Sequence, residues 1–125
     1  MIIVDSSGWL EYFIEGPNAG VFEPVVSDPE SLIVPTITIY EVFKQIARRT
    51  NDAEAITLTS LMLKGKIADL DTATSVDAAR ISVENHLGMA DSILLATAKL
   101  YRAILWTQDS DFIGIQGVEY VAARN

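Results

Sequence analysis

Five acidic residues of this chain follow apolar segments or open new ones, and their types and spacing are suited to metal chemistry. They are Asp5, Glu41, Asp91, Asp109 and Asp111. In a parallel α/β sheet the carboxyl ends of the strands share one edge, and ligands bind there. Carboxylates gathered at that edge repel one another unless a proton or a cation lies among them. Mg²⁺ and Mn²⁺ prefer hard oxygen ligands, so the pattern predicts a metal site.

Each acid also has a local explanation. Asp5 and Asp91 fit the N-termini of helices, where backbone amides and the helix dipole favour carboxylates. Glu41 fits a capping box with Thr38, and Asp109 fits a turn or the start of a short helix. These local roles explain the acids one at a time. A shared site explains why so many of them lie after separate apolar segments.

Polar and basic side chains near the acids indicate how the site could be completed. The hydroxyls of Ser6 and Thr107 could orient carboxylates or bind a water ligand, although a cap or turn hydrogen bond fits them equally well. Lys44 and Arg48 lie three and seven residues after Glu41, on the same helical face. Both are candidates for contact with a substrate phosphate, with an ion pair or a solvated surface as the alternative.

The composition bounds the class of protein. The chain has 125 residues, 50% of them hydrophobic, and no cysteine. One globular domain over residues 1–125 is therefore expected. Disulfides, thiolate metal sites and a cysteine nucleophile are excluded. His86 is the only histidine, so a serine-type triad would depend on it alone, and we expect it to be a surface or structural residue.

Charge and hydropathy bear on location and partners. No apolar run approaches the roughly 20 residues of a membrane helix, and the start of the chain lacks the basic segment of a signal peptide. We therefore expect a cytoplasmic protein without membrane contact. The net charge of −8 disfavours a broad electrostatic grip on nucleic acid. It does not exclude a nuclease, because bound cations would offset part of it.

The segments that must position these residues alternate between strand and helix patterns, which favours an α/β fold. Strands are expected at residues 2–5, 32–34, 66–70, 104–106 and 118–121. Helices are expected at residues 6–14, 19–26, 38–49, 52–63, 71–87 and 91–102.

Several helix details follow from the same patterns. Ser6 or Ser7 is expected to cap the first helix, Glu11 to lie at its solvated surface, and Asp71 or Thr72 to cap the fifth helix. The 91–102 helix is apolar nearly all round, which predicts either burial or self-association. The 71–87 helix is expected to bury a stripe made of Val76, Ala79, Val83 and Leu87.

Four segments together resemble the PIN-domain family. They are Val-Asp-Ser-Ser at residues 4–7, Glu41, Ala-Asp-Ser-Ile-Leu-Leu-Ala-Thr-Ala at residues 90–98, and Thr-Gln-Asp-Ser-Asp-Phe at residues 107–112. Within the family, the compact length is similar to that of the VapC-type toxins of toxin–antitoxin pairs. The resemblance implies a central parallel sheet of about five strands with helices on both faces. It also implies metal-dependent cleavage of single-stranded RNA.

The resemblance further implies roles for particular residues. Asp5, Glu41, Asp91 and Asp109 match the family's acidic quartet, which would bind Mg²⁺ or Mn²⁺ and be catalytic, and Asp111 matches a further, less constant acid. A bound Mg²⁺ lowers the pKa of water, so that no protein nucleophile is needed. A protein antitoxin as inhibitor and a homodimer are also implied. An apolar helix of that inhibitor is expected to fit between the 38–49 and 52–63 helices.

Other classes of function share parts of this pattern. A housekeeping RNA-processing PIN nuclease, and a PIN-like module that binds metal or partners without catalysis, both stay open. A response-regulator receiver would carry an acidic pair after the first strand, whereas Asp5 is followed by Ser6 and Ser7. A haloacid-dehalogenase-like phosphatase would show Asp-x-Asp-x-Thr at the same place, and this chain does not.

Overall fold

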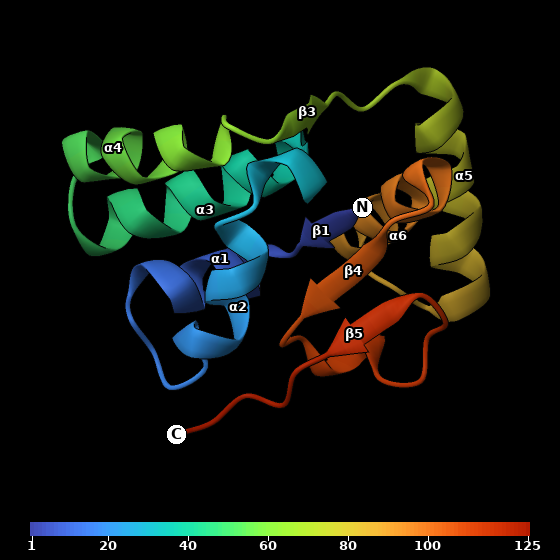
Figure 1. Cartoon of the computed structure of the whole chain (residues 1–125). Coiled ribbons are helices and arrows are strands. Elements are labelled where there is room, and N and C mark those ends of the chain that lie inside the picture. Colours follow the sequence, from blue (N-terminus) through green and yellow to red (C-terminus); the bar gives the residue numbers. More distant parts are fainter.

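The computed structural model describes residues 1–125 and contains five short strands, all paired in parallel. The strands are β1 Ile2–Val4, β2 Ile33–Pro35, β3 Lys66–Ala68, β4 Ile104–Thr107 and β5 Val118–Tyr120. Helices separate consecutive strands through most of the chain, as Figure 1 shows. The predicted α/β class, with about five parallel strands, is confirmed.

The strands form two hydrogen-bonded sheets instead of the single expected one. One has the order β1-β4-β5 and the other pairs β2 with β3. A single bridge between Ile2 and Leu32 joins them. Pro35 ends β2 and has no N–H, so it cannot donate a hydrogen bond to a ladder between β1 and β2 at their carboxyl ends.

Six α-helices and two 3₁₀ helices surround the strands. They are α1 Ser6–Phe13, α2 Ala19–Val26, η1 Pro29–Ser31, α3 Thr36–Arg49, α4 Asp52–Met62, α5 Thr72–Asn85, α6 Met89–Tyr101 and η2 Ser110–Phe112. In Figure 1, α1 to α4 lie to one side of the strands and α5 and α6 to the other. The expected elements are therefore all present, with ends shifted by a few residues.

Two apolar clusters, one on each side of the strands, hold the layers together. Ile3 and Ile33 belong to the cluster formed with α5 and α6, whereas Val4 and Val34 belong to the cluster formed with α1 to α4. Successive residues of a strand point to opposite faces. Each strand of a parallel sheet that is covered on both faces therefore has a continuously apolar sequence, as β1 has.

Several helix ends differ from the sequence prediction. Asp5, and not Ser6 or Ser7, is the N-cap of α1. The predicted capping box of Thr38 and Glu41 does not form, because α3 begins directly after Pro35 and Thr38 is buried within the helix. Glu41 is thereby left available for another role.

Other helix ends follow the prediction more closely. Asp71 caps α5, with its Oδ1 accepting a hydrogen bond of 2.8 Å from the amide of Thr74. Asn51 caps α4, one residue before the expected start. The α5 helix ends at Asn85, and His86 adopts a left-handed conformation with φ of 56°.

The buried stripe predicted for α5 is wrong at Val76, Ala79 and Val83, whereas Leu87 is buried as predicted, just beyond the end of the helix. Val76 and Val83 are exposed, Val83 to 76%. Instead, α5 buries Thr74, Ala78 and Ile81, which repeat at the same helical spacing and pack toward α6. The small side chain of Ala78 permits a close approach of the two helices, and hydropathy alone favoured the valines.

Helix α6 lies in the core. Residues 92–98 are all buried, which confirms that the helix is a core element and accounts for its apolar character without self-association. None of the helices combines the length and apolar character needed to cross a bilayer.

Candidate metal-binding active site

Asp5 lies at the carboxyl end of β1 and is held by hydrogen bonds on both carboxylate oxygens. Its Oδ1 accepts a bond of 2.7 Å from the amide of Ser6, which satisfies a free N–H at the start of α1. Its Oδ2 accepts bonds from the hydroxyls of Ser7 at 3.1 Å and Thr107 at 2.8 Å. The carboxylate therefore has a fixed orientation.

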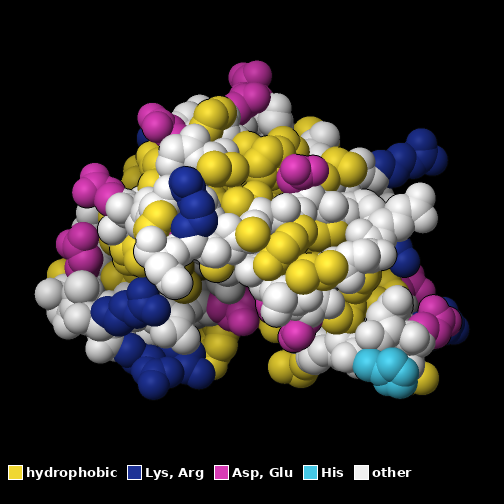
Figure 2. Space-filling model, turned by 90° about the horizontal axis from the view of Figure 1, so that it is seen from below, with side chains coloured by type: hydrophobic (Ala, Val, Ile, Leu, Met, Phe, Trp, Pro, Cys, Tyr) yellow, Lys and Arg dark blue, Asp and Glu magenta, His cyan; other side chains and the backbone are white.

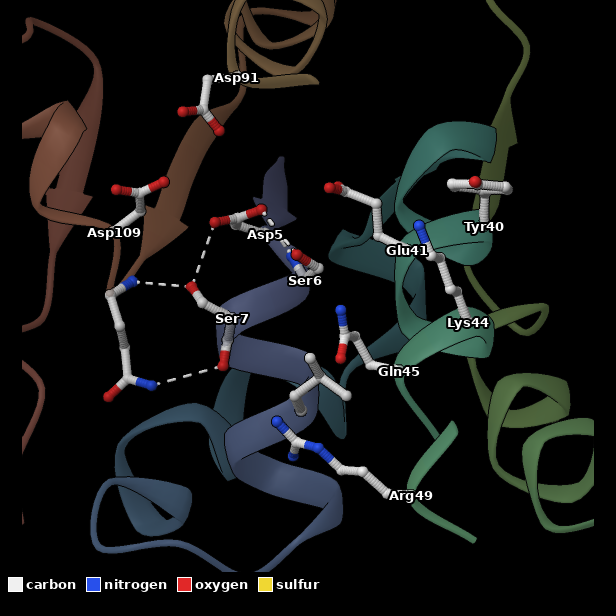
Figure 3. Close-up of a pocket in the computed structure, with 12 residues that line it drawn as sticks. Asp5, Ser6, Ser7, Tyr40, Glu41, Lys44, Gln45, Arg49, Asp91 and Asp109 are labelled. Carbon is white, nitrogen blue, oxygen red and sulfur yellow. Dashed lines mark hydrogen bonds between the residues drawn. The ribbon is translucent and has the colours of Figure 1, made fainter. Parts of the chain in front are cut away.

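Four of the predicted acids converge on one open cavity of about 510 Å³. They are Asp5 after β1, Glu41 on α3, Asp91 in the first turn of α6, and Asp109 after β4. In Figure 3 their carboxylates point toward one another from different elements. The structure thus brings together residues that are up to about a hundred positions apart in sequence.

Asp111 lies beside this group but does not line the cavity. Carboxylate oxygens of Asp91, Asp109 and Asp111 lie within 4.8 Å of one another, a spacing that a single ion could bridge. The amide of Asp111 donates a bond of 2.9 Å to Oδ1 of Asp109, which caps η2. Asp91 and Asp109 belong to both sets, so they form the centre of the candidate site.

Burial and mutual repulsion raise the pKa values of three carboxyl groups. The pKa of Asp91 is raised to about 7, first by burial and then by the charges of Asp109, Asp5 and Asp111. Burial raises the pKa of Asp5 against the opposing hydrogen bonds from Thr107, Ser6 and Ser7. Burial also raises the pKa of Glu41, and the charges of Asp5 and Asp109 add to the effect. The site therefore favours an added proton or cation.

The donor set fits a hard divalent cation. Every group at the centre is a carboxylate or a hydroxyl, which suits Mg²⁺ or Mn²⁺. No lysine or arginine forms an ion pair with these acids, because the chain's one ion pair joins Arg80 to Asp77 on the far α5 helix. The charge of Lys44 partly offsets that of Glu41, but no carboxylate of the cavity is neutralised by a direct ion pair.

The hydroxyls of Thr107 and Ser7 hold the acidic residues in place. Thr107 was predicted to do so, whereas Ser7 was predicted only as a helix cap. Thr107 is fully buried and also accepts a bond of 2.9 Å from the amide of Asp109, so it links two of the acids. Ser7 accepts a bond of 3.0 Å from the amide of Gln108 while it donates to Asp5. Its position in the first turn of α1, two residues after Asp5, was the available signal.

The α3 side of the cavity differs in part from the prediction. Lys44 lines the cavity as expected, but Arg48 is exposed and lies outside it. Arg49 lines it instead, together with Tyr40 and Gln45. Sequence spacing could not distinguish the two arginines, because both lie about one turn beyond Gln45.

Glu11 was expected at the solvated surface, and this expectation was wrong. It is only 8% exposed and accepts a bond of 3.3 Å from the amide of Asn18. A side chain at Gly16 would collide with its carboxylate. Glu11 does not line the acidic cavity; it stabilises the turn between α1 and α2. His86 is exposed and also lies outside the cavity.

The family model of the PIN domain matches this sequence over residues 2–118. The chain belongs to the PIN-domain family. No match is found among curated proteins.

Solved structures with the same fold include a toxin, a toxin–antitoxin complex and a VapBC protein. A toxin–antitoxin complex from Klebsiella pneumoniae has a TM-score of 0.79 and 23% identity, over 95% of this chain and 96% of the other. The sarcin-ricin loop cleaving toxin VapC20 of Mycobacterium tuberculosis has a TM-score of 0.77 and 16% identity, over the whole of both chains. VapBC2 of Rickettsia felis, bound to a DNA fragment from its promoter, has a TM-score of 0.75 and 14% identity over 96% and 98%.

Proposed function

We propose that this chain is a Mg²⁺- or Mn²⁺-dependent endoribonuclease that cleaves single-stranded RNA and acts as the toxin of a toxin–antitoxin pair. One observation carries the proposal: four carboxylates from separate elements face one open cavity without any ion-paired cation. Membership of the PIN-domain family supports it. We take residues 1–125 to be a single nuclease domain.

The proposed roles follow from where each side chain lies. Asp5, Glu41, Asp91 and Asp109 would hold the cation, and Asp111 is placed to add a ligand. A divalent cation there supplies a water of lowered pKa and offsets charge that develops on the phosphate. Ser6, Ser7 and Thr107 keep the Asp5 carboxylate oriented. Lys44 at the rim is placed to meet a substrate phosphate.

A second cavity, lined by apolar side chains and by Glu15 and Glu23 but by none of the four acids, supports the proposal of a protein inhibitor. About 400 Å³ in volume, it lies between α1, α2 and α4, and its lining includes Phe13, Leu58 and Leu61. Ile56 on α4 and Leu63 directly after it are exposed, whereas Met62 is buried. The groove expected between α3 and α4 is not the one found, because these two helices pack on each other.

We propose that an apolar helix of an antitoxin docks in this α1/α2–α4 groove and presents an Arg or Lys to the acidic cavity. The net charge of −8 favours a basic partner. We further propose that the chain forms a homodimer, as the family resemblance implies. Static light scattering of the purified chain at tens of micromolar measures the dimer directly, and a monomer at that concentration would contradict it.

A cleavage assay separates the proposed enzyme from a binding module. Purified chain is incubated with labelled single-stranded RNA in Mg²⁺ and in EDTA, beside folded Asp91→Asn protein. We expect fragments only from the unmodified chain in Mg²⁺, since the Asn side chain cannot supply a charged ligand. Equal cleavage by Asp91→Asn would exclude this site. Co-purification from the native host then tests the toxin assignment: a chain that emerges without a partner would favour a housekeeping RNA-processing nuclease.

A further inference from the structure

Basic and aromatic side chains border the acidic cavity on one side only. Of its 12 lining residues, Lys44 and Arg49 are the only Lys or Arg, and both come from α3. The opposite side carries Asp91, Asp109 and Gln108. In Figure 2, dark blue side chains gather to one side of a hollow that holds magenta ones. A polyanion entering the cavity therefore meets cations on one flank.

Helix α3 extends that flank away from the carboxylates. Glu41, Gln45 and Arg49 recur at a spacing of four residues and all line the cavity. Eight residues of helix span about 12 Å along the axis. In Figure 3, Gln45 lies between the carboxylates and Arg49. Arg49 is therefore placed for a phosphate other than the one held at the carboxylates.

Tyr40 provides an aromatic surface at the same rim. Its side chain is 63% exposed, and the Nζ of Lys44 lies 5.7 Å from the ring centroid. The ring is therefore not needed in the core, and much of it stays open to solvent. Aromatic rings beside cations serve as stacking platforms for the bases of single strands. A helix-stabilising contact between Tyr40 and Lys44 would not require both residues to line the cavity.

The two cations are free to bind phosphate. The chain's one ion pair joins Arg80 and Asp77, so neither Lys44 nor Arg49 is held by a carboxylate. Arg49 also lies in the last turn of α3, where a cation interacts favourably with the helix dipole. That local role predicts an effect on stability and none on the salt dependence of RNA binding.

We infer that the chain grips its RNA on one flank of the scissile phosphate, with Tyr40 stacking on a base and Lys44 and Arg49 contacting neighbouring phosphates. This inference rests on the proposed function. Its consequence is asymmetry: nucleotides on the α3 flank contribute to affinity, and those beyond Asp91 and Asp109 contribute little.

The first experiment measures binding alone. Fluorescence anisotropy of a short labelled single-stranded RNA in Ca²⁺ is followed over a range of salt concentrations. Each phosphate contact contributes a slope of about −0.7 in log affinity against log salt for single strands. Arg49→Gln should make the slope shallower by about that amount. Arg80→Gln removes the same charge on α5 and should leave the slope unchanged.

Substitution of Tyr40 should change the affinity for RNA and leave its salt dependence unchanged. Tyr40→Ala should weaken binding by roughly tenfold or more with no change in salt slope, because stacking releases no counterions. Tyr40→Phe should restore affinity. If Tyr40→Ala binds as the unmodified chain does, or if Arg49→Gln behaves as Arg80→Gln does, the inference is overturned.

A second experiment tests the asymmetry. An RNA with a mapped cleavage position is shortened from each end in turn, and KM is measured in Mg²⁺. We expect KM to rise on shortening from one end only, and Arg49→Gln to reduce the difference. Equal losses from both ends would overturn the inference. If RNA binds with the expected variant effects but is never cleaved, the proposed catalysis fails while the assignment of Tyr40, Lys44 and Arg49 to RNA binding stands. If the unmodified chain binds no RNA, both fail.

Discussion

The Oγ1 of Thr107 donates a hydrogen bond of 2.8 Å to Oδ2 of Asp5, across 102 residues of sequence. The register of β1 and β4 pairs Val4 with Trp106, so Asp5 and Thr107 are the next residues along neighbouring parallel strands. The same hydroxyl accepts a bond from the amide of Asp109. Strand pairing thus fixes the relative positions of two proposed metal ligands through one side chain.

Thr107→Val should therefore lower metal affinity and RNA cleavage while the core stays packed. Valine has nearly the shape of threonine but cannot donate to Asp5, and groups that orient metal ligands typically contribute roughly 10- to 100-fold in affinity or activity. Thr107→Ser keeps the hydroxyl and should retain most activity. Mg²⁺ titration of the cleavage rate measures the effect. Equal half-saturating Mg²⁺ in the valine variant and the unmodified chain would contradict this role.

The raised pKa of Asp91 makes stability without metal depend on pH. Its carboxyl pKa is about 7 in the folded chain against 3.8 for the free group. The folded state therefore holds a proton that the unfolded state releases, so this contribution to stability is present below about pH 4 and is lost as pH rises to about 7. We expect the Tm in EDTA to fall across that window. Asp91→Asn should make the Tm less dependent on pH and raise it at neutral pH. An unchanged dependence of Tm on pH would mean that burial and the neighbouring carboxylates do not raise the pKa of Asp91.

Protons and cations should also compete for the same carboxylates. Below a pH of about 7 a growing fraction of Asp91 is protonated, so more Mg²⁺ is needed to displace the proton. The half-saturating Mg²⁺ for RNA cleavage should therefore be higher at pH 6 than at pH 8. Measuring it at both pH values, with ionic strength held constant, provides the check. A half-saturating concentration independent of pH would mean that Asp91 does not bind the ion in its charged form.

Some of the candidate site could be predicted from strand order, and some could not. Asp5 and Asp109 follow parallel strands directly, so the shared edge of the sheet predicts that they meet. Glu41 and Asp91 lie on helices, so strand order alone does not fix where they point; the pattern of acids beside apolar segments and the family resemblance together indicated a shared site. Arg49 was missed because it and Arg48 both lie about one turn beyond Gln45, and spacing alone does not say which of them lines the cavity.

The errors in the fold have the same physical origin. Val83 of α5 was assigned to the buried face, whereas Thr74 is the buried residue, because hydropathy ranks valine above threonine and two stripes of helical period were available. The burial of Glu11 depends on a turn that brings the amide of Asn18 to its carboxylate. No periodic pattern within α1 distinguishes a buried acid from a solvated one.

The turn between α1 and α2 gives a matched pair of glycine substitutions. A Cβ at Gly16 would collide with the Glu11 carboxylate, whereas nothing lies within 4 Å of a Cβ at Gly20. Gly16→Ala should lower the free energy of unfolding by about 1–3 kcal/mol, because the buried side chain must shift or lose its bond to Asn18. Gly20→Ala lies in α2 and should be neutral or stabilise by up to about 1 kcal/mol, because alanine favours helix. Urea unfolding of both variants measures the difference, and equal midpoints would mean that Glu11 adapts without cost. If Gly16→Ala also keeps its RNA cleavage, Glu11 is confirmed as a residue of the fold and not of the acidic cavity.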